Sequence, residues 1–221
     1  MALDPQTSEP PARGARLPRS ARRAQLLVAA QEVFVENGYH AAAMDEIADR
    51  AGVSKPVLYQ HFPGKLDLYL AILDRHIDEL LVAVRRGLDS THDNKLRVAA
   101  TIGAYFAFVD REDAPFRLVF ESDLTNDSAV RERVDRLERL CAEAIADVIG
   151  EDTGLPREES ELLGMALTGM AQVTARYWLQ SGRGIPRSEA ERLTAQLSWR
   201  GLGGFPKHEA QGSAADPAAG W

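Results

Sequence analysis

Helical periodicity is the feature that most restricts the fold of this chain. Apolar residues recur at three- and four-residue spacing almost throughout residues 20–199, as in the run Leu66, Leu70, Leu73, Ile77 and Leu80. This spacing places side chains on one face of an α-helix, whereas a half-buried strand needs alternation every second residue. No segment shows a convincing strand pattern. The sequence therefore predicts an all-α protein of about nine helices.

Glycine and proline divide this pattern into separate helices. We expect a disordered basic arm at residues 1–17, a small domain at 18–64, a larger helical bundle domain at 65–205 and a disordered tail at 206–221. The small domain should hold three helices, at about 20–37, 44–51 and 55–62. The larger domain should hold six, which begin or lie at about 65–88, 95–113, 114–122, 130–148, 158–180 and 187–199.

The charge of the chain is distributed unevenly. The net charge is −7, yet residues 1–65 carry eight Lys and Arg against seven Asp and Glu. Five arginines lie between Ala12 and Gln31 with no acidic residue among them. A cationic segment of this kind can meet phosphate while the rest of the molecule stays acidic.

The sequence offers no sign of secretion or membrane insertion. It has no apolar run of 18 residues and no signal-peptide pattern behind its N-terminal arginines, so we expect a cytoplasmic protein with no membrane partner. The single cysteine, Cys141, allows no intrachain disulfide and is expected to be a buried apolar residue.

The segment MDEIADRAGVSKPVLYQHF, residues 44–62, predicts a helix-turn-helix. Gly52 can adopt the left-handed turn between two short helices. Ser54 is a good N-cap for the second of them, and Pro56 falls in its first turn. Leu58 and Phe62 should be buried. In a helix-turn-helix the second helix is presented to the major groove of DNA.

The side chains left on the outer face of that second helix suit DNA. A lysine can reach a phosphate or a guanine edge, and a valine can meet a thymine methyl. Tyrosine, glutamine and histidine can donate hydrogen bonds to phosphates or bases. The residues concerned are Lys55, Val57, Tyr59, Gln60 and His61. Three helices with outward polar residues also occur in folds that bind no DNA.

The stretch ENGYHAAAMDEIADRAGVSKPVLYQHFPGKLDLYLAIL resembles the N-terminal signature of the TetR family of bacterial transcriptional repressors. The similarity runs from about Arg22 to Leu73 and includes Phe34, Gly38, Tyr39, Ile47, Ala48, the run Ala51 to Ser54, Leu58, Tyr59, His61, Phe62 and Lys65. It implies a three-helix DNA-binding head and a helical C-terminal domain that dimerises and usually binds a small effector.

The resemblance also implies roles for single residues. Lys55, Pro56 and Val57 would open the recognition helix, Tyr59 and His61 would contact the operator backbone, and Lys65 a phosphate. The complete expected DNA-binding set is Arg22, Lys55, Pro56, Val57, Tyr59, Gln60, His61 and Lys65.

The chain departs from the family pattern before the second helix. Ala42 and Ala43 replace the usual Ser or Thr, and Asp45 stands where a basic residue is common. The missing hydroxyl costs a helix cap, typically about 1 kcal/mol, and puts one phosphate contact per subunit in doubt.

Apolar and aromatic residues of the larger domain are candidates for an effector pocket, although such residues are more often plain core. The expected ligand-binding set is His76, Phe106, Phe116, Phe120, Met170, Gln172 and Tyr177. The last two helices are expected to form the dimer surface, as the family implies. The residues predicted for it are Leu162, Ala166, Val173, Trp178, Leu193 and Leu197.

Three alternatives compete with this interpretation. An enzyme is disfavoured because the five histidines are scattered and no phosphate loop, serine elbow or Cys/His metal spacing occurs, so we expect no catalytic residue, metal or cofactor. A helical adaptor that binds protein is the second, and a DNA-binding regulator without an effector is the third. The preferred function is a repressor, active as a homodimer on a palindromic double-stranded operator and released by a small, mainly hydrophobic effector. The operator sequence, the effector and the direction of regulation stay open.

Overall fold

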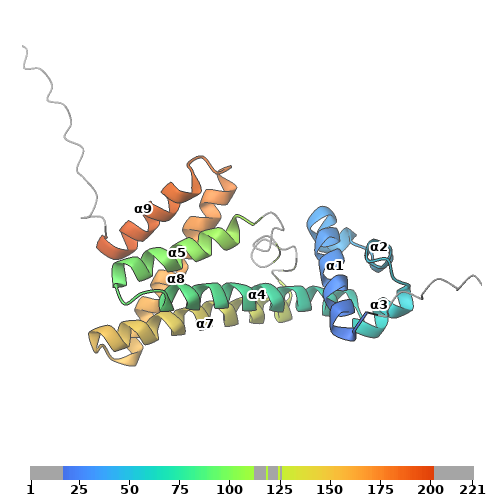
Figure 1. Ribbon diagram of the computed structural model, residues 1–221, viewed down its shortest axis with the longest axis horizontal. Coiled ribbons are helices and arrows are strands. Elements are labelled where there is room, and N and C mark those ends of the chain that lie inside the picture. Colours follow the sequence, from blue (N-terminus) through green and yellow to red (C-terminus); the bar gives the residue numbers. More distant parts are fainter. Residues whose placement is uncertain (1–16, 112–117, 119–123, 125, 202–221) are drawn as a thin grey trace, which may run out of the picture. The chain divides into compact units, whose positions relative to one another are not determined.

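The computed structural model describes residues 17–111, 118, 124 and 126–201 (Figure 1). Regular structure in these residues is entirely helical, which confirms the predicted all-α class. They hold eight helices, labelled α1–α5 and α7–α9. Of the short helix expected at 114–122, only Leu118 is described, and it is helical and buried. The expected arm, apart from Leu17, and the expected tail lie outside the described residues.

The chain divides into two compact units at Ala71 and Ile72. The first holds α1 (Arg19–Ala41), α2 (Met44–Arg50), α3 (Lys55–His61) and the first two turns of α4 (Lys65–Asp89). The sequence places this boundary at residue 64. It falls later because Tyr69 of α4 packs edge-on against the Phe34 ring of α1, with centroids 5.2 Å apart. The core of the unit is Leu26, Ala30, Val33, Phe34, Ile47, Ala48, Leu58, Phe62, Leu68 and Tyr69.

The end of α1 differs from the prediction of a stop at Gly38. Gly38 does leave the helical conformation, with φ 74° and ψ 168°, but a further turn follows to Ala41. The Lys65 ammonium stabilises that turn. Its Nζ donates to the carbonyl oxygens of Tyr39, His40 and Ala42 at 2.7, 3.1 and 2.9 Å.

The turn between α2 and α3 forms as the sequence predicts. Gly52 takes φ +62°, and the Val53 amide donates to the carbonyl of Ala48 at 3.0 Å. Ser54 occupies the N-cap position of α3, but its hydroxyl makes no capping hydrogen bond. At the start of α2 the N-cap residue Ala43 likewise supplies no side-chain cap, as expected for an alanine.

The second unit contains the rest of α4 with α5 (Asn94–Val109), α7 (Ser128–Thr153), α8 (Arg157–Gln180) and α9 (Arg187–Arg200). α7 packs along α8, and α5 contacts both α8 and α9 (Figure 1). The α7–α8 crossing is closest at Gly164, where an added Cβ would lie 2.3 Å from the carbonyl oxygen of Ala142. Asp93 and Asp127 cap α5 and α7 by accepting backbone amides. Among the described helices, none is long and apolar enough to cross a membrane.

Candidate nucleic-acid interface and ligand cavity

α3 has an apolar face that is buried and a more polar face that points outward. Leu58, and Phe62 directly after the helix, are fully buried. The outer face presents the residues predicted for it: Lys55, Pro56, Tyr59 and Gln60 are exposed, while Val57 and His61 are half-buried. Beside this face lies an open hollow of about 640 Å³, whose lining includes Arg19, Arg22, Val57, Gln60 and His61. The arrangement provides a polar surface around a short, exposed helix.

Lys55, at the start of α3, is already paired within the protein. Its Nζ lies 2.5 Å from Oδ2 of Asp45 in the first turn of α2, and both side chains are more than half exposed. The hydrogen bond to Asp45 raises the pKa of Lys55, and the charge of Asp49 adds to the effect. Lys55 is therefore a fully charged cation with a carboxylate beside it.

Other cations of this unit also have internal partners. Arg50 pairs with Glu36 at 2.7 Å and with Glu46 at 3.5 Å. Arg22 donates to the Gln25 side chain, whose Nε2 in turn donates to the Ala51 carbonyl and so ties α1 to the α2–α3 turn. These interactions hold the helices together, and the glutamates beside Arg50 also reduce the positive charge available to a polyanion.

Lys65 is the expected phosphate contact whose surroundings differ most from the prediction. Three backbone carbonyls accept from its Nζ, which also lies 4.6 Å from the centre of the Tyr39 ring. An ammonium has three donor hydrogens, so these bonds use all of them. A phosphate would have to displace at least one, and the Lys65 contact stays a prediction.

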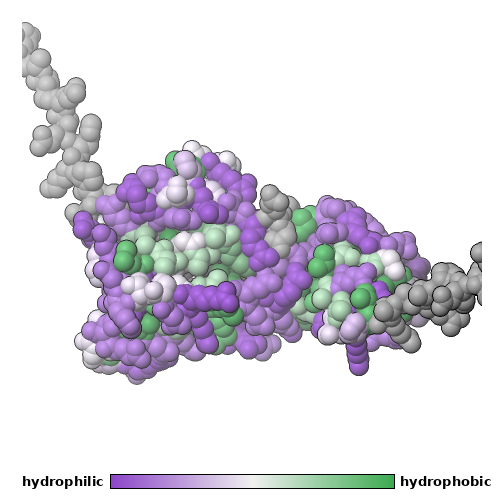
Figure 2. Space-filling view, in the orientation of Figure 1, coloured by the Kyte–Doolittle hydropathy of each residue, from purple (hydrophilic) through white to green (hydrophobic). Residues whose placement is uncertain are grey.

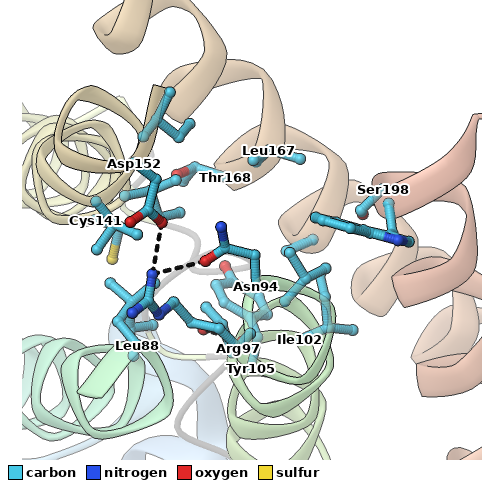
Figure 3. A pocket seen from close by; sticks show the side chains of 18 of the residues that line it. Leu88, Asn94, Arg97, Ile102, Tyr105, Cys141, Asp152, Leu167, Thr168 and Ser198 are labelled. Atoms are coloured by element: carbon cyan, nitrogen blue, oxygen red, sulfur yellow. Dashed lines mark hydrogen bonds and ion pairs between the residues drawn. The ribbon is translucent and has the colours of Figure 1, made fainter. Parts of the chain in front are cut away.

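A cavity of about 310 Å³ lies among five helices of the second unit (Figure 3). Its walls come from α4, α5, α7, α8 and α9, and most of the side chains that form them are apolar. These apolar residues are Val84, Leu88, Val98, Ile102, Ile145, Val148, Ile149, Leu167, Ala171 and Trp199. A concave apolar site with a few polar groups is the usual form of a small-molecule pocket.

Charged side chains line this cavity at one end. Arg97 Nη1 donates to Oδ2 of Asp152 at 2.9 Å and to Oδ1 of Asn94 at 2.8 Å, drawn as dashed lines in Figure 3. The bond to Asp152 joins the start of α5 to the end of α7. Arg97 and Asp152 neutralise each other, so this end is polar without carrying net charge.

Two hydroxyls in the cavity wall behave differently from the rest. Tyr105 and Thr168 are each only 5 % exposed, and Oγ1 of Thr168 is buried without a hydrogen-bond partner among the described residues. Burial raises the pKa of Tyr105 well above its usual range. Burial also raises the pKa of the nearby Cys141 thiol to about 12, so both groups are neutral.

The residues predicted to bind a ligand are not those that line this cavity. His76 and Phe106 are fully buried, Met170 and Gln172 are half-buried, and Tyr177 is 72 % exposed. Phe116 and Phe120 lie outside the described residues. Large aromatic side chains fill space in a helical bundle, whereas medium-sized residues leave it open. Small polar residues within apolar helix faces, such as Thr168, were the available signal.

His76 takes part in an ion-pair cluster. Its Nδ1 lies 3.1 Å from Oε2 of Glu79, which also binds Arg111 at 2.6 Å. Burial lowers the pKa of His76, and the opposing effect of Glu79 is smaller. The cluster joins α4 to the segment directly after α5.

The predicted dimer residues fall into two groups. Leu162 and Val173 are exposed at 72 % and 54 %, and Ala166 is exposed on the same helix. Leu193 and Leu197 of α9 are half-buried. Trp178, in contrast, is a core residue of its own chain, 5 % exposed, and its Nε1 donates to the Ile185 carbonyl at 2.8 Å.

Tyr177 belongs with the exposed group. It continues the row of Leu162, Ala166 and Val173 along α8 at spacings of four, seven and four residues, which lie on one helix face. Apolar surface also gathers around α5, bordered by hydrophilic residues, in the view of Figure 2. Patches of this kind commonly mark interaction sites.

Comparison with known proteins identifies the family. The family model described as "Bacterial regulatory proteins, tetR family" matches residues 26–72, which span most of α1, α2, α3 and the start of α4. The chain is also 47 % identical over 194 residues to the HTH-type transcriptional activator FasR of Mycolicibacterium smegmatis, covering 88 % of this chain and 89 % of that protein. The chain belongs to the TetR family.

Solved structures of transcriptional regulators share the fold. A tetR-family transcriptional regulator from Streptomyces coelicolor superposes with a TM-score of 0.68 at 30 % identity, covering 82 % of this chain and 80 % of that one. The transcriptional regulator FadR from Bacillus subtilis, solved in complex with stearoyl-CoA, gives 0.67 at 18 % identity, with 81 % and 98 % covered. The TetR-family member described here is therefore a transcriptional regulator with a helix-turn-helix and a helical C-terminal domain.

Proposed function

We propose that this TetR-family regulator binds a palindromic operator as a homodimer, with one α3 helix in each of two successive major grooves. The observation that carries the proposal is the outer face of α3, where Lys55, Tyr59 and Gln60 are exposed while Leu58 anchors the helix. Successive major grooves on one side of B-DNA lie about 34–36 Å apart, which sets the spacing of the two α3 helices.

The exposed apolar row on α8 supports the homodimer. Leu162, Ala166, Val173 and Tyr177 would lose contact with water against the same row of a second copy. Two-fold association of this kind is isologous, so one patch serves both subunits. It also matches the symmetry of a palindrome.

The cavity of the second unit supports an effector with an apolar body. Val84 and Leu88 of α4 line it, and the same continuous helix begins at Lys65 in the head. A ligand that changes the position of α4 would change the DNA-binding competence of the dimer. Its effect is limited by its preference between the two states, about 10⁴-fold for a nearly complete switch.

The direction of regulation is proposed from the relative. FasR, at 47 % identity, is named an activator, which favours activation over the repression expected from the sequence. We therefore propose that the DNA-bound dimer activates transcription.

Selection of genomic fragments by the purified full chain tests the proposal. We expect an enriched inverted repeat among the selected fragments and a dimeric mass for the free protein by light scattering. Transcription of the genes next to that repeat should fall when the gene for the regulator is deleted. A monomer at micromolar concentration, or the absence of any enriched repeat, would refute the dimeric operator-binding function. If transcription of the genes next to the operator rises when the regulator gene is deleted, the protein is a repressor and the proposal of activation is wrong.

A further inference from the structure

The hydroxyls of Tyr105 and Thr168 in the cavity wall specify the ligand more narrowly than an apolar cavity does; this inference rests on the proposed effector function. Tyr105 on α5 and Thr168 on α8 line the same cavity, and the buried Oγ1 of Thr168 lacks a partner among the described residues. Buried polar groups are nearly always hydrogen-bonded, so the Thr168 hydroxyl in this cavity needs an explanation.

A pure hydrocarbon is a poor occupant of this cavity. It would exclude water from both hydroxyls and supply no partner, which leaves their desolvation uncompensated. By contrast, Thr101 and Ser198 in the same lining already donate to the backbone carbonyls of Arg97 and Thr194, at 2.9 Å each. Tyr105 and Thr168 are thus the hydroxyls left for a ligand.

The oxygen that meets them must be uncharged. The charged groups in the lining are Arg97 and Asp152, which bind each other at one end of the cavity. Tyr105 and Thr168 offer hydroxyl hydrogens but no positive charge. A carboxylate or phosphate placed beside them would be an unpaired buried ion, which proteins avoid.

We propose that the effector is a neutral, oxygen-bearing aliphatic molecule, such as a ketone, alcohol or ester, whose oxygen accepts a hydrogen bond from Tyr105 or Thr168 inside the apolar cavity. The volume of about 310 Å³ accommodates roughly ten non-hydrogen atoms if each takes about the 30 Å³ of a water molecule. The ligand class is therefore of medium chain length.

An isosteric pair of probes tests this directly. 2-Nonanone and 2-methyl-1-nonene have the same shape and size and differ by a carbonyl oxygen in place of a methylene group. Binding of each to the full-length protein is measured by calorimetry, for the native chain and for Tyr105→Phe and Thr168→Val. Each substitution removes one hydroxyl and keeps the side-chain shape.

We expect the ketone to bind more tightly than the alkene to the native chain. Tyr105→Phe or Thr168→Val should weaken ketone binding by about two- to tenfold, as expected for one lost hydrogen bond, and leave alkene binding unchanged or stronger. Thr174→Val is the matched control, because its hydroxyl donates to the Met170 carbonyl at 2.6 Å and lies outside the cavity lining, and it should not alter the ratio of the two affinities.

Two results would overturn the inference, and only one of them would also contradict the proposed effector site. If both probes bind equally and neither variant changes their ratio, the cavity remains an effector site but the oxygen requirement is wrong. If neither probe binds the native chain, the apolar effector site is wrong as well. DNA binding by the same samples reports independently on the helix-turn-helix function.

Discussion

Replacing Asp45 by Asn should make the protein bind DNA more tightly and with steeper salt dependence. Asp45 holds the Lys55 ammonium at 2.5 Å and adds a negative charge of its own next to the recognition helix. Asparagine keeps the size of the side chain and removes that charge, so Lys55 becomes available to phosphate. Sequence discrimination should fall, because phosphate contacts carry no sequence information.

The expected change in salt dependence follows from the number of phosphate contacts. Each phosphate neutralised steepens the plot of log affinity against log salt by about 0.9, so one freed lysine in each of two heads adds about 1.8. Over a fourfold rise in salt, from about 50 to 200 mM, that slope corresponds to an extra loss of roughly tenfold in affinity. Fluorescence anisotropy with a short random-sequence duplex measures it.

Two further variants isolate the cause. Asp49→Asn makes the same change of net charge on α2, but Asp49 acts on Lys55 through charge alone, without a hydrogen bond to it. It should steepen the slope much less. In the background of Lys55→Gln, Asp45→Asn should lose most of its effect. An unchanged slope for Asp45→Asn, or an equal change for Asp49→Asn, would show that Asp45 does not restrain Lys55.

Four other substitutions address binding, packing and pH. Tyr59→Ala should weaken binding to every duplex with little change in the thermal midpoint, because the ring is exposed; unfolding of the head would place the ring in the core instead. Gly164→Ala should destabilise the protein by about 1–3 kcal/mol through overpacking, since the new Cβ meets a backbone oxygen at 2.3 Å. Gly103→Ala, whose Cβ would meet nothing closer than 3.9 Å, should instead raise the free energy of unfolding by up to about 1 kcal/mol. Denaturant titrations that rank the two variants in the opposite order would refute the close α7–α8 crossing at Gly164. The pKa of His76 is lowered in the folded state, so the unfolded chain binds more protons, and stability should fall as pH drops from about 6.5 through that lower pKa. His76→Gln should flatten this part of the stability profile, and a profile identical to that of the native chain would exclude His76 as its source.

The sequence by itself determined the head almost completely. Its signals are local: Gly52 permits the left-handed turn, Leu58 and Phe62 fix which face of α3 is buried, and the exposed residues follow from the helical period. Even the missing cap at Ala43 is visible from the residue type. Interactions within three or four residues of each other need no knowledge of the rest of the chain.

Pairings between distant residues could not be read in this way. Lys65 closes the last turn of α1 through carbonyls more than twenty positions away, and Lys55 meets Asp45 across the turn. Both lysines could be assigned to a DNA surface by position in a motif. Which anion or carbonyl each one meets depends on how the helices cross.

In the second unit, even less of the packing between distant residues could be predicted from the sequence. Its helices follow from periodicity. Residues of α8 were assigned to a dimer surface only through the family resemblance, and the sequence could not distinguish Trp178 in the core from Tyr177 on the surface, one residue along the same helix. Nor could it place the cavity, because a void is what remains when five helices fail to fill the space between them. Helical period determines which residues share a face; only tertiary packing determines whether that face meets another helix, solvent or an empty space.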